Sequence, residues 1–261
     1  MNPDRIEALA RQLVSARRES KPAAIDSANF PLDAIEAYAV QERVSALLYG
    51  GQRATAWKVG APDMSVEPTA SPIRAPLVLQ SPARYELPAL SGLSIEAEVA
   101  FRVGRDVMDA STDPASVFDR MLVTIEVCDS RIADPGGAGA WLKLADYQVN
   151  AALVLGSGRD DWAGYDLSTQ RCLVTCDGAV VFDRRSGHSL GDPRCLLPWL
   201  LAHASTRGGL RAGDVVTTGT WCGMVPVRPG AAIEVSFDDI GAAQVSFAMA
   251  ATHLRSELAE N

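Results

Sequence analysis

Histidine and cysteine are scarce in this sequence of 261 residues, which has three of the former and five of the latter. The cysteines are odd in number and form no C-x-x-C pair, so neither a disulfide framework nor a zinc site is expected. His188, His203 and His253 are too few to complete a soft metal site. We therefore expect free thiols in a reducing compartment, which favours a cytoplasmic protein.

Long apolar runs and concentrated positive charge are also absent. No uncharged stretch reaches the roughly 20 residues that a membrane helix needs, and residues 1–20 lack the apolar core of a signal peptide. Lys and Arg number 24 against 32 Asp and Glu, which gives a net charge of −8. Binding to phosphate backbones needs a concentrated basic surface, so we expect neither nucleic acid nor a membrane as a partner.

What the sequence does contain is an ordinary globular composition, arranged in two zones. Residues 1–55 place apolar side chains at helical spacing, and Gly50-Gly51 marks the end of the second helix. Residues 56–261 are rich in strand patterns that do not alternate with helices, including a hairpin with Asp177-Gly178 as its turn. We predict an α+β fold, with a helical N-terminal segment (1–55) followed by a strand-rich catalytic domain (56–261).

Glu96 and Glu98 lie in the segment SIEAEVAFRVG, whose apolar residues alternate strictly. Residues two apart on a strand point to the same side, separated by about 6.6 Å of rise. Both carboxylates can therefore approach one object. For this pair alone, the solvated polar face of a half-buried strand is the simpler explanation.

Glu126 changes that weighting, because it lies within the apolar run LVTIEVCD, which is typical of a buried strand. Burying a charged carboxylate in such a strand costs roughly several kcal/mol unless a partner compensates the charge. That partner could be Arg131, in a structural ion pair. It could instead be a hard cation, since three carboxylates without His or Cys suit Mg²⁺, Mn²⁺ or Ca²⁺.

The segment GHSLG, residues 187–191, matches the G-x-S-x-G pattern of a hydrolase nucleophile elbow. An elbow holds its serine directly between a strand and a helix. Here the helix start, Asp192-Pro193, follows the motif, and RRS separates the motif from the preceding strand. A serine hydrolase that uses Ser189 is therefore a rival hypothesis that the local context disfavours.

Four segments in matching order resemble the fumarylacetoacetate hydrolase superfamily: GLSIEAEVAFRVGRDV, TIEVCDSRIAD, LADYQVNAALVLG and GDVVTTGT…PVRPG. The segments AYAVQERV and WKVG are similar to its branch of 2-oxopent-4-enoate (2-hydroxypentadienoate) hydratases and 4-oxalocrotonate decarboxylases. The resemblance runs from about residue 30 to about residue 250. It implies a fumarylacetoacetate-hydrolase-like mixed β-sheet roll and a homo-oligomer.

The resemblance also implies a ligand set and a catalytic lysine. Glu96, Glu98 and Glu126 match the three residues that hold Mg²⁺ or Mn²⁺ in the family, and Lys58 matches a lysine near the metal. We expect Lys58 to act as an acid or base, with its pKa lowered by an apolar pocket. Asp146 is the second catalytic candidate, moving protons with Lys58.

Three further residues are candidates for binding substrate. Lys143 precedes Asp146 by three positions, and the two either hold a substrate carboxylate or form an exposed ion pair. Thr220 follows Gly219 and either touches the substrate carboxylate or caps a turn. His188 either lies over the site or belongs to a solvated loop.

The expected activity is hydration of a 2-hydroxy-2,4-dienoate, by way of its 2-oxo-enoate tautomer, to a 4-hydroxy-2-oxo acid in aromatic catabolism. Decarboxylation of the 4-oxalocrotonate type and C–C hydrolysis of an acylpyruvate are alternatives, because all three can proceed through a metal-stabilised enolate. A non-catalytic subunit is a further alternative. The sequence departs from the family pattern in three places, so the exact substrate is not determined. These are Tyr147, Ala231 and the loop 60–79, which lacks an expected acidic pair near its end.

Overall fold

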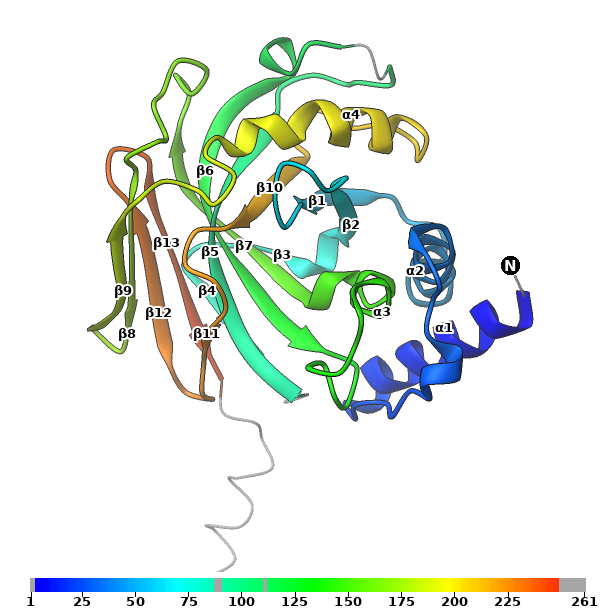
Figure 1. Cartoon of the computed structure of the whole chain (residues 1–261). Helices are drawn as coiled ribbons and strands as arrows, with labels where there is room; N and C mark the ends of the chain where they lie inside the picture. The colour runs from blue at the N-terminus through cyan, green and yellow to red at the C-terminus, as the bar shows by residue number, and fades with distance from the viewer. Residues whose placement is uncertain (1–2, 87–90, 110–111, 249–261) are drawn as a thin grey trace, which may run out of the picture.

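The computed structural model describes residues 3–86, 91–109 and 112–248. Its α-helices are α1 (Pro3–Glu19), α2 (Ala34–Tyr49), α3 (Ala140–Ala145) and α4 (Leu197–Ser205). Short 3₁₀ turns span Ser27–Asn29, Ala75–Leu77, Pro114–Ser116, Tyr147–Val149 and Pro193–Leu196. Figure 1 shows two facing β-sheets, with α1, α2 and α3 gathered on the side away from the smaller sheet.

The larger sheet has eight strands, seven of them in the order β2-β1-β10-β5-β6-β7-β3, with β11 also paired to β5. These strands are β2 (Thr69–Arg74), β1 (Ala54–Gly60), β10 (Val215–Thr220), β5 (Ser91–Val103), β6 (Phe118–Ser130), β7 (Asn150–Arg159), β3 (Val78–Gln80) and β11 (Val225–Pro226). β1 runs parallel to β10 and β3 parallel to β7, while the other pairs are antiparallel. The sheet is therefore mixed, as the family resemblance implied.

The smaller sheet has the order β4-β13-β12-β8-β9. Its strands are β4 (Ala83–Tyr85), β13 (Gly241–Phe247), β12 (Ala232–Phe237), β8 (Arg171–Cys176) and β9 (Ala179–Arg185). The β8–β9 hairpin turns at Asp177 and Gly178, which have φ of 51° and 80°. Positive φ at both positions is what a type I′ turn requires, so the predicted hairpin is confirmed.

The main apolar core lies between the two sheets. The alternating residues Ile95, Ala97, Val99, Phe101 and Val103 are all buried there, together with Val123, Ile125 and Val127 of β6 and Val174, Val235 and Val245 of the smaller sheet. Because successive residues of a strand face opposite sides, the residues between these point to the other face of the larger sheet. That face carries the predicted glutamates.

The helices begin and end at residues that the sequence marks. The Asp33 carboxylate accepts a hydrogen bond from the Glu36 N–H at the start of α2, and Gly50 ends that helix in the left-handed conformation. Asp192 caps the 3₁₀ turn 193–196, and α4 follows from Leu197. Pro198 does not interrupt α4, because it lies in the first turn of that helix, where its missing N–H is not needed.

Candidate functional site

The glutamates meet because of the pairing between β5 and β6. Glu96 lies directly opposite Glu126 in the antiparallel register, and Glu98 lies opposite Thr124. Glu98 and Glu126 are completely buried. Three carboxylates from two neighbouring strands therefore share one face of the larger sheet, the face opposite the main core.

Lys58 of β1 supplies the positive charge nearest these carboxylates. Its Nζ lies 2.8 Å from Oε2 of Glu126 and 3.2 Å from Oε2 of Glu96. Burial disfavours its charged form, but Glu126 and Glu96 outweigh burial and hold the pKa of Lys58 well above its usual value. The prediction of a lowered pKa for Lys58 is therefore wrong. It assumed an apolar pocket, whereas two carboxylates lie beside the ammonium.

Burial works against ionisation of the two innermost glutamates. It raises the pKa of Glu98, with Glu126 as the next cause, and it raises the pKa of Glu126 against the opposing charge of Lys58. The Thr217 hydroxyl donates a hydrogen bond to Glu98, and the Asn150 side-chain amide donates one to Glu126 at 3.0 Å. Arg131, the alternative partner, makes no ion pair with Glu126; it pairs with Asp146.

One buried oxygen of these three glutamates has no hydrogen-bond donor among the described residues. It is Oε1 of Glu98. Oε2 of Glu126 is also buried, and its partner is the Lys58 ammonium at 2.8 Å. Ligand atoms of Glu96, Glu126 and Cys128 also lie within 4.8 Å of one another. Hard oxygens in this number fit a divalent cation such as Mg²⁺ or Mn²⁺. Cys128 faces the same spot, a position that sequence reasoning did not assign to the site.

A cavity of about 270 Å³ opens on Lys58 and Glu96. His188 is among its lining residues and is only 7% exposed, so the solvated-loop interpretation of this residue is wrong. Its ring packs edge-on against Trp221, and its Nδ1 accepts a hydrogen bond from the Leu190 N–H at 3.2 Å. Burial lowers the pKa of His188, so this side chain is neutral at pH 7.

Thr220 and Gln148 line the same cavity. The Thr220 hydroxyl donates to the Gly223 carbonyl at 3.2 Å and accepts from the Cys222 N–H at 3.3 Å, so Thr220 both caps the turn after β10 and reaches the cavity. Sequence reasoning missed Gln148, because a single glutamine carries no motif. The one available signal was its position directly after Asp146-Tyr147.

Lys143 and Asp146 have different surroundings, although they are three residues apart in the chain. Lys143 lines a neighbouring cavity of about 210 Å³ together with Ser94 and Cys128. Asp146 is buried and accepts hydrogen bonds from the Arg131 Nε at 2.6 Å and the Arg131 backbone N–H at 3.0 Å. None of its contacts among the described residues involves Lys58 or the three glutamates.

Ser189 does not have the surroundings of a nucleophile. It is exposed in a turn closed by the pair His188↔Gly191, and no hydrogen bond within the described part of the chain joins it to a histidine. His203 packs against Tyr38, Trp57 and Trp199 instead. His253 lies outside the described residues.

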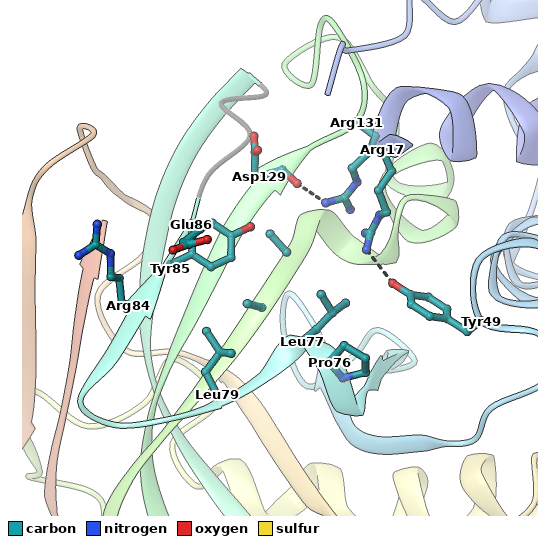
Figure 2. Close-up of a pocket in the computed structure, with 12 residues that line it drawn as sticks. Arg17, Tyr49, Pro76, Leu77, Leu79, Arg84, Tyr85, Glu86, Asp129 and Arg131 are labelled. Carbon is teal, nitrogen blue, oxygen red and sulfur yellow. Dashed lines mark hydrogen bonds between the residues drawn. The ribbon is translucent and has the colours of Figure 1, made fainter. Parts of the chain in front are cut away.

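A separate cavity of about 480 Å³ lies where the ends of α1 and α2 approach β3, β4, β6 and β7. Figure 2 shows Arg17 reaching into it and donating to the Tyr49 hydroxyl, a contact of 2.9 Å. Arg131, on the same side, donates to the Asp129 carbonyl. Arg17 forms no ion pair with a carboxylate of the described residues, and its pKa is lowered by burial and then by Arg131.

No helix in the described ranges is long and apolar enough to cross a membrane.

Comparison with known proteins gives consistent results. Residues 52–248 match the family model described as fumarylacetoacetate (FAA) hydrolase C-terminal. A 2-keto-4-pentenoate hydratase of Paraburkholderia xenovorans (strain LB400) is 27% identical, with 95% of this chain and 96% of that protein aligned. A protein named 2-keto-4-pentenoate hydratase 2, from Dechloromonas aromatica (strain RCB), is 30% identical over 93% of this chain and 97% of its own length.

Among solved structures, the 4-oxalocrotonate decarboxylase of Pseudomonas putida G7, complexed with magnesium and adipate, has the same fold. Its TM-score is 0.77 at 22% identity, with 95% of this chain and 98% of that chain covered. The same protein complexed with calcium and acetate has a TM-score of 0.76 at 23% identity, with the same coverage. At this level of identity the likeness is one of fold alone.

Proposed function

The chain belongs to the fumarylacetoacetate hydrolase family and is an enzyme similar to hydratases, and from this premise we propose that it hydrates a 2-hydroxy-2,4-dienoate to a 4-hydroxy-2-oxo acid. The observation that carries the proposal is a cavity lined by Lys58 and Glu96, in which Lys58 also pairs with the buried Glu126. The names of the curated relatives favour hydration over decarboxylation or C–C hydrolysis.

The proposal includes a divalent cation, Mg²⁺ or Mn²⁺, held by Glu96, Glu98 and Glu126. The buried Oε1 of Glu98, which has no donor among the described residues, supports it, as does the absence of soft ligands among these three side chains. When bound, the ion supplies a Lewis acid that stabilises the enolate of a 2-oxo acid. Magnesium and calcium in the solved relatives with this fold agree with a hard cation.

We assign proton movement to Nζ of Lys58, which faces both Glu96 and the cavity. In hydration the dienol takes a proton at its vinyl end, and water then adds to the conjugated double bond. Lys58 is the cavity residue whose ammonium can give the first proton and whose amine can take one from water. Thr220 and the neutral imidazole of His188, which line the same cavity, bind the substrate.

We propose a different role for Asp146 from the proton transfer first expected of it. Both of its carboxylate oxygens accept hydrogen bonds from Arg131, so Asp146 acts by positioning the turn 147–149 that follows it. Lys143, in the neighbouring cavity with Ser94 and Cys128, remains the candidate for binding a distant part of the substrate. A homo-oligomer in the catabolism of aromatic compounds remains part of the proposal.

The direct test is incubation of the protein with Mg²⁺ and 2-hydroxypenta-2,4-dienoate, following loss of the dienol absorbance and formation of 4-hydroxy-2-oxopentanoate by NMR. We expect turnover in the native protein. Hydrolysis of an acylpyruvate, or release of carbon dioxide from 4-oxalocrotonate, without turnover of the dienoate would overturn the hydratase assignment.

The metal assignment has its own test in the variant Glu126→Gln. Losing a ligand carboxylate is expected to weaken Mn²⁺ binding, measured by electron paramagnetic resonance, by about 100-fold or more, and to reduce turnover in parallel. Glu234→Gln on the exposed face of β12 is the matched control and should change neither quantity. Full Mn²⁺ affinity in a folded Glu126→Gln protein, verified by circular dichroism, would refute the assignment.

A further inference from the structure

The turn that joins α3 to β7 has an unusual backbone. Tyr147, Gln148 and Val149 have φ of 56°, 53° and 59°. Residues other than glycine rarely adopt this left-handed conformation, and a β-branched residue such as Val149 is disfavoured there most of all. Three such residues in succession require anchors on both sides. Backbone strain of this kind concentrates at functional sites.

Both anchors are present. Asp146, directly before the turn, is bound by the buried Arg131. Asn150, directly after it, donates its side-chain amide to Glu126 at 3.0 Å. The turn is therefore held between a buried ion pair and one of the carboxylates of the site.

The side chain of Gln148 is fixed as firmly as its backbone. Its Nε2 donates to the Thr69 hydroxyl at 3.0 Å, and its Oε1 accepts from the Ser71 hydroxyl at 2.9 Å. Ser71 in turn accepts from Nε2 of Gln41 at 3.0 Å, and Gln41 also donates to the Leu144 carbonyl at 2.9 Å. Ser71 and Gln41 are buried, so their part of the network is shielded from bulk water, while Thr69 and Gln148 are half-buried.

The amide that this network orients lines the cavity that also contains Lys58, Glu96 and His188. A primary amide has two N–H donors and two carbonyl lone pairs. Thr69 and Ser71 use one of each, which leaves one donor and one acceptor for a bound molecule. The neutral Gln148 amide can both donate and accept a hydrogen bond, so it is suited to binding a hydroxyl or a water molecule. A carboxylate at this position would instead favour a cation.

We propose that Gln148 is the specificity-determining residue that binds the 4-hydroxyl of the product, and hence the water that becomes it, while Thr69, Ser71 and Gln41 are positioning residues. This inference rests on the proposed function, because it assumes that the 2-oxo acid end of the substrate lies near Glu96. It adds a substrate class: 4-hydroxy-2-oxo acids with an uncharged tail.

The test compares three ligands by isothermal titration calorimetry in the presence of Mg²⁺: 4-hydroxy-2-oxopentanoate, 2-oxopentanoate and oxalate. We expect the native protein to bind the hydroxylated acid about 10-fold more tightly than 2-oxopentanoate, since one satisfied hydrogen bond in a buried site is worth roughly that factor. Gln148→Leu should abolish this preference and leave oxalate affinity unchanged. Gln244→Leu, on an exposed position of β13, is the control and should keep the preference.

A second pair of variants distinguishes loss of the orientation of the Gln148 amide from a general loss of structure. Thr69→Val removes the hydroxyl that holds the amide and should weaken the preference about 3-fold, whereas Thr69→Ser retains the hydroxyl and should restore it. Gln148→Asn, which tolerates a positive φ but is shorter, replaces Gln148→Leu if the latter does not fold; it should also lose the preference.

The outcomes for Gln148 and for the hydratase activity are distinguishable. A preference for the hydroxylated acid that disappears in the Gln148 variants supports the inference even if 2-hydroxypenta-2,4-dienoate is not turned over. Equal affinity of the native protein for the two 2-oxo acids, or an unchanged preference in folded Gln148 variants, overturns it even if the dienoate is hydrated.

Discussion

At the scale of single residues, the surroundings of each charged side chain determine what it can do. Lys58 lies among glutamates, and they hold it in its charged form. Arg131 is buried, but it has Asp146 and three carbonyl oxygens as acceptors. Arg17 differs from both, because the one hydrogen bond that its side chain makes to a described residue goes to the neutral Tyr49 hydroxyl (Figure 2).

Arg17 is therefore expected to cost stability. A half-buried guanidinium beside the charge of Arg131, without a carboxylate partner, is less favourable than an apolar side chain of similar length. We expect Arg17→Met to raise the free energy of unfolding by about 1 kcal/mol, measured by urea denaturation. Arg18→Met, at the exposed neighbouring position, should change it little. A clear loss of stability in Arg17→Met would show that the Tyr49 contact outweighs the cost of burying the charge.

At the scale of elements, the site depends on two connections. The register of β5 with β6 brings Glu96 opposite Glu126, and the pair Arg131–Asp146 ties the end of β6 to the end of α3. The second connection sets where the turn 147–149 begins, and that turn carries Gln148 to the cavity.

Asp146→Asn tests this second connection. Removing one partner of a buried ion pair leaves an uncompensated charge, so the free energy of unfolding should fall by about 3 kcal/mol. Asp161→Asn breaks the exposed pair with Arg159 and should cost less than about 1 kcal/mol. Urea denaturation measures both. If Asp146→Asn kept its stability but lost turnover, the role in proton transfer would be restored.

At the scale of the whole molecule, α4 is joined to α2 and β1 through a cluster of rings around His203. The ring of His203 stacks on Trp199 and packs against Tyr38 and Trp57. Burial, and then the charge of Arg207, lower the pKa of His203 to about 4. The folded protein therefore holds this histidine neutral, while the unfolded chain takes up a proton as the pH falls below about 6.5.

The sign of the resulting pH dependence follows from linkage. A folded-state pKa below the unfolded value means that stability is fully present above about pH 6.5 and is lost as the pH falls toward 4. Because His203 is partly exposed, we expect a loss of about 1–2 kcal/mol across this window. His203→Phe should lose less stability over the same window, as measured by urea denaturation at several pH values. Parallel curves for the two proteins would contradict the assignment to His203.

The sequence by itself determined the features that depend on local periodicity and on matched motifs. The strict alternation around Glu96 and Glu98 predicted which side of β5 would pack into the main core between the sheets, because neighbouring residues of a strand necessarily face opposite ways. The α+β class, the hairpin at Asp177-Gly178 and the family followed from patterns of the same kind. Each of these requires only residues that are near in the chain or are read in order along it.

Only the tertiary structure decided the features that depend on which distant residues meet. Arg131 pairs with Asp146 and not with Glu126, His188 is buried against Trp221, and the charge on Lys58 is held by glutamates from two other strands. The physical reason is that burial and Coulomb interaction fall off with distance in space, and sequence spacing does not measure that distance. Gln148 is the clearest case, because its neighbours Thr69, Ser71 and Gln41 lie at least 77 residues away along the chain.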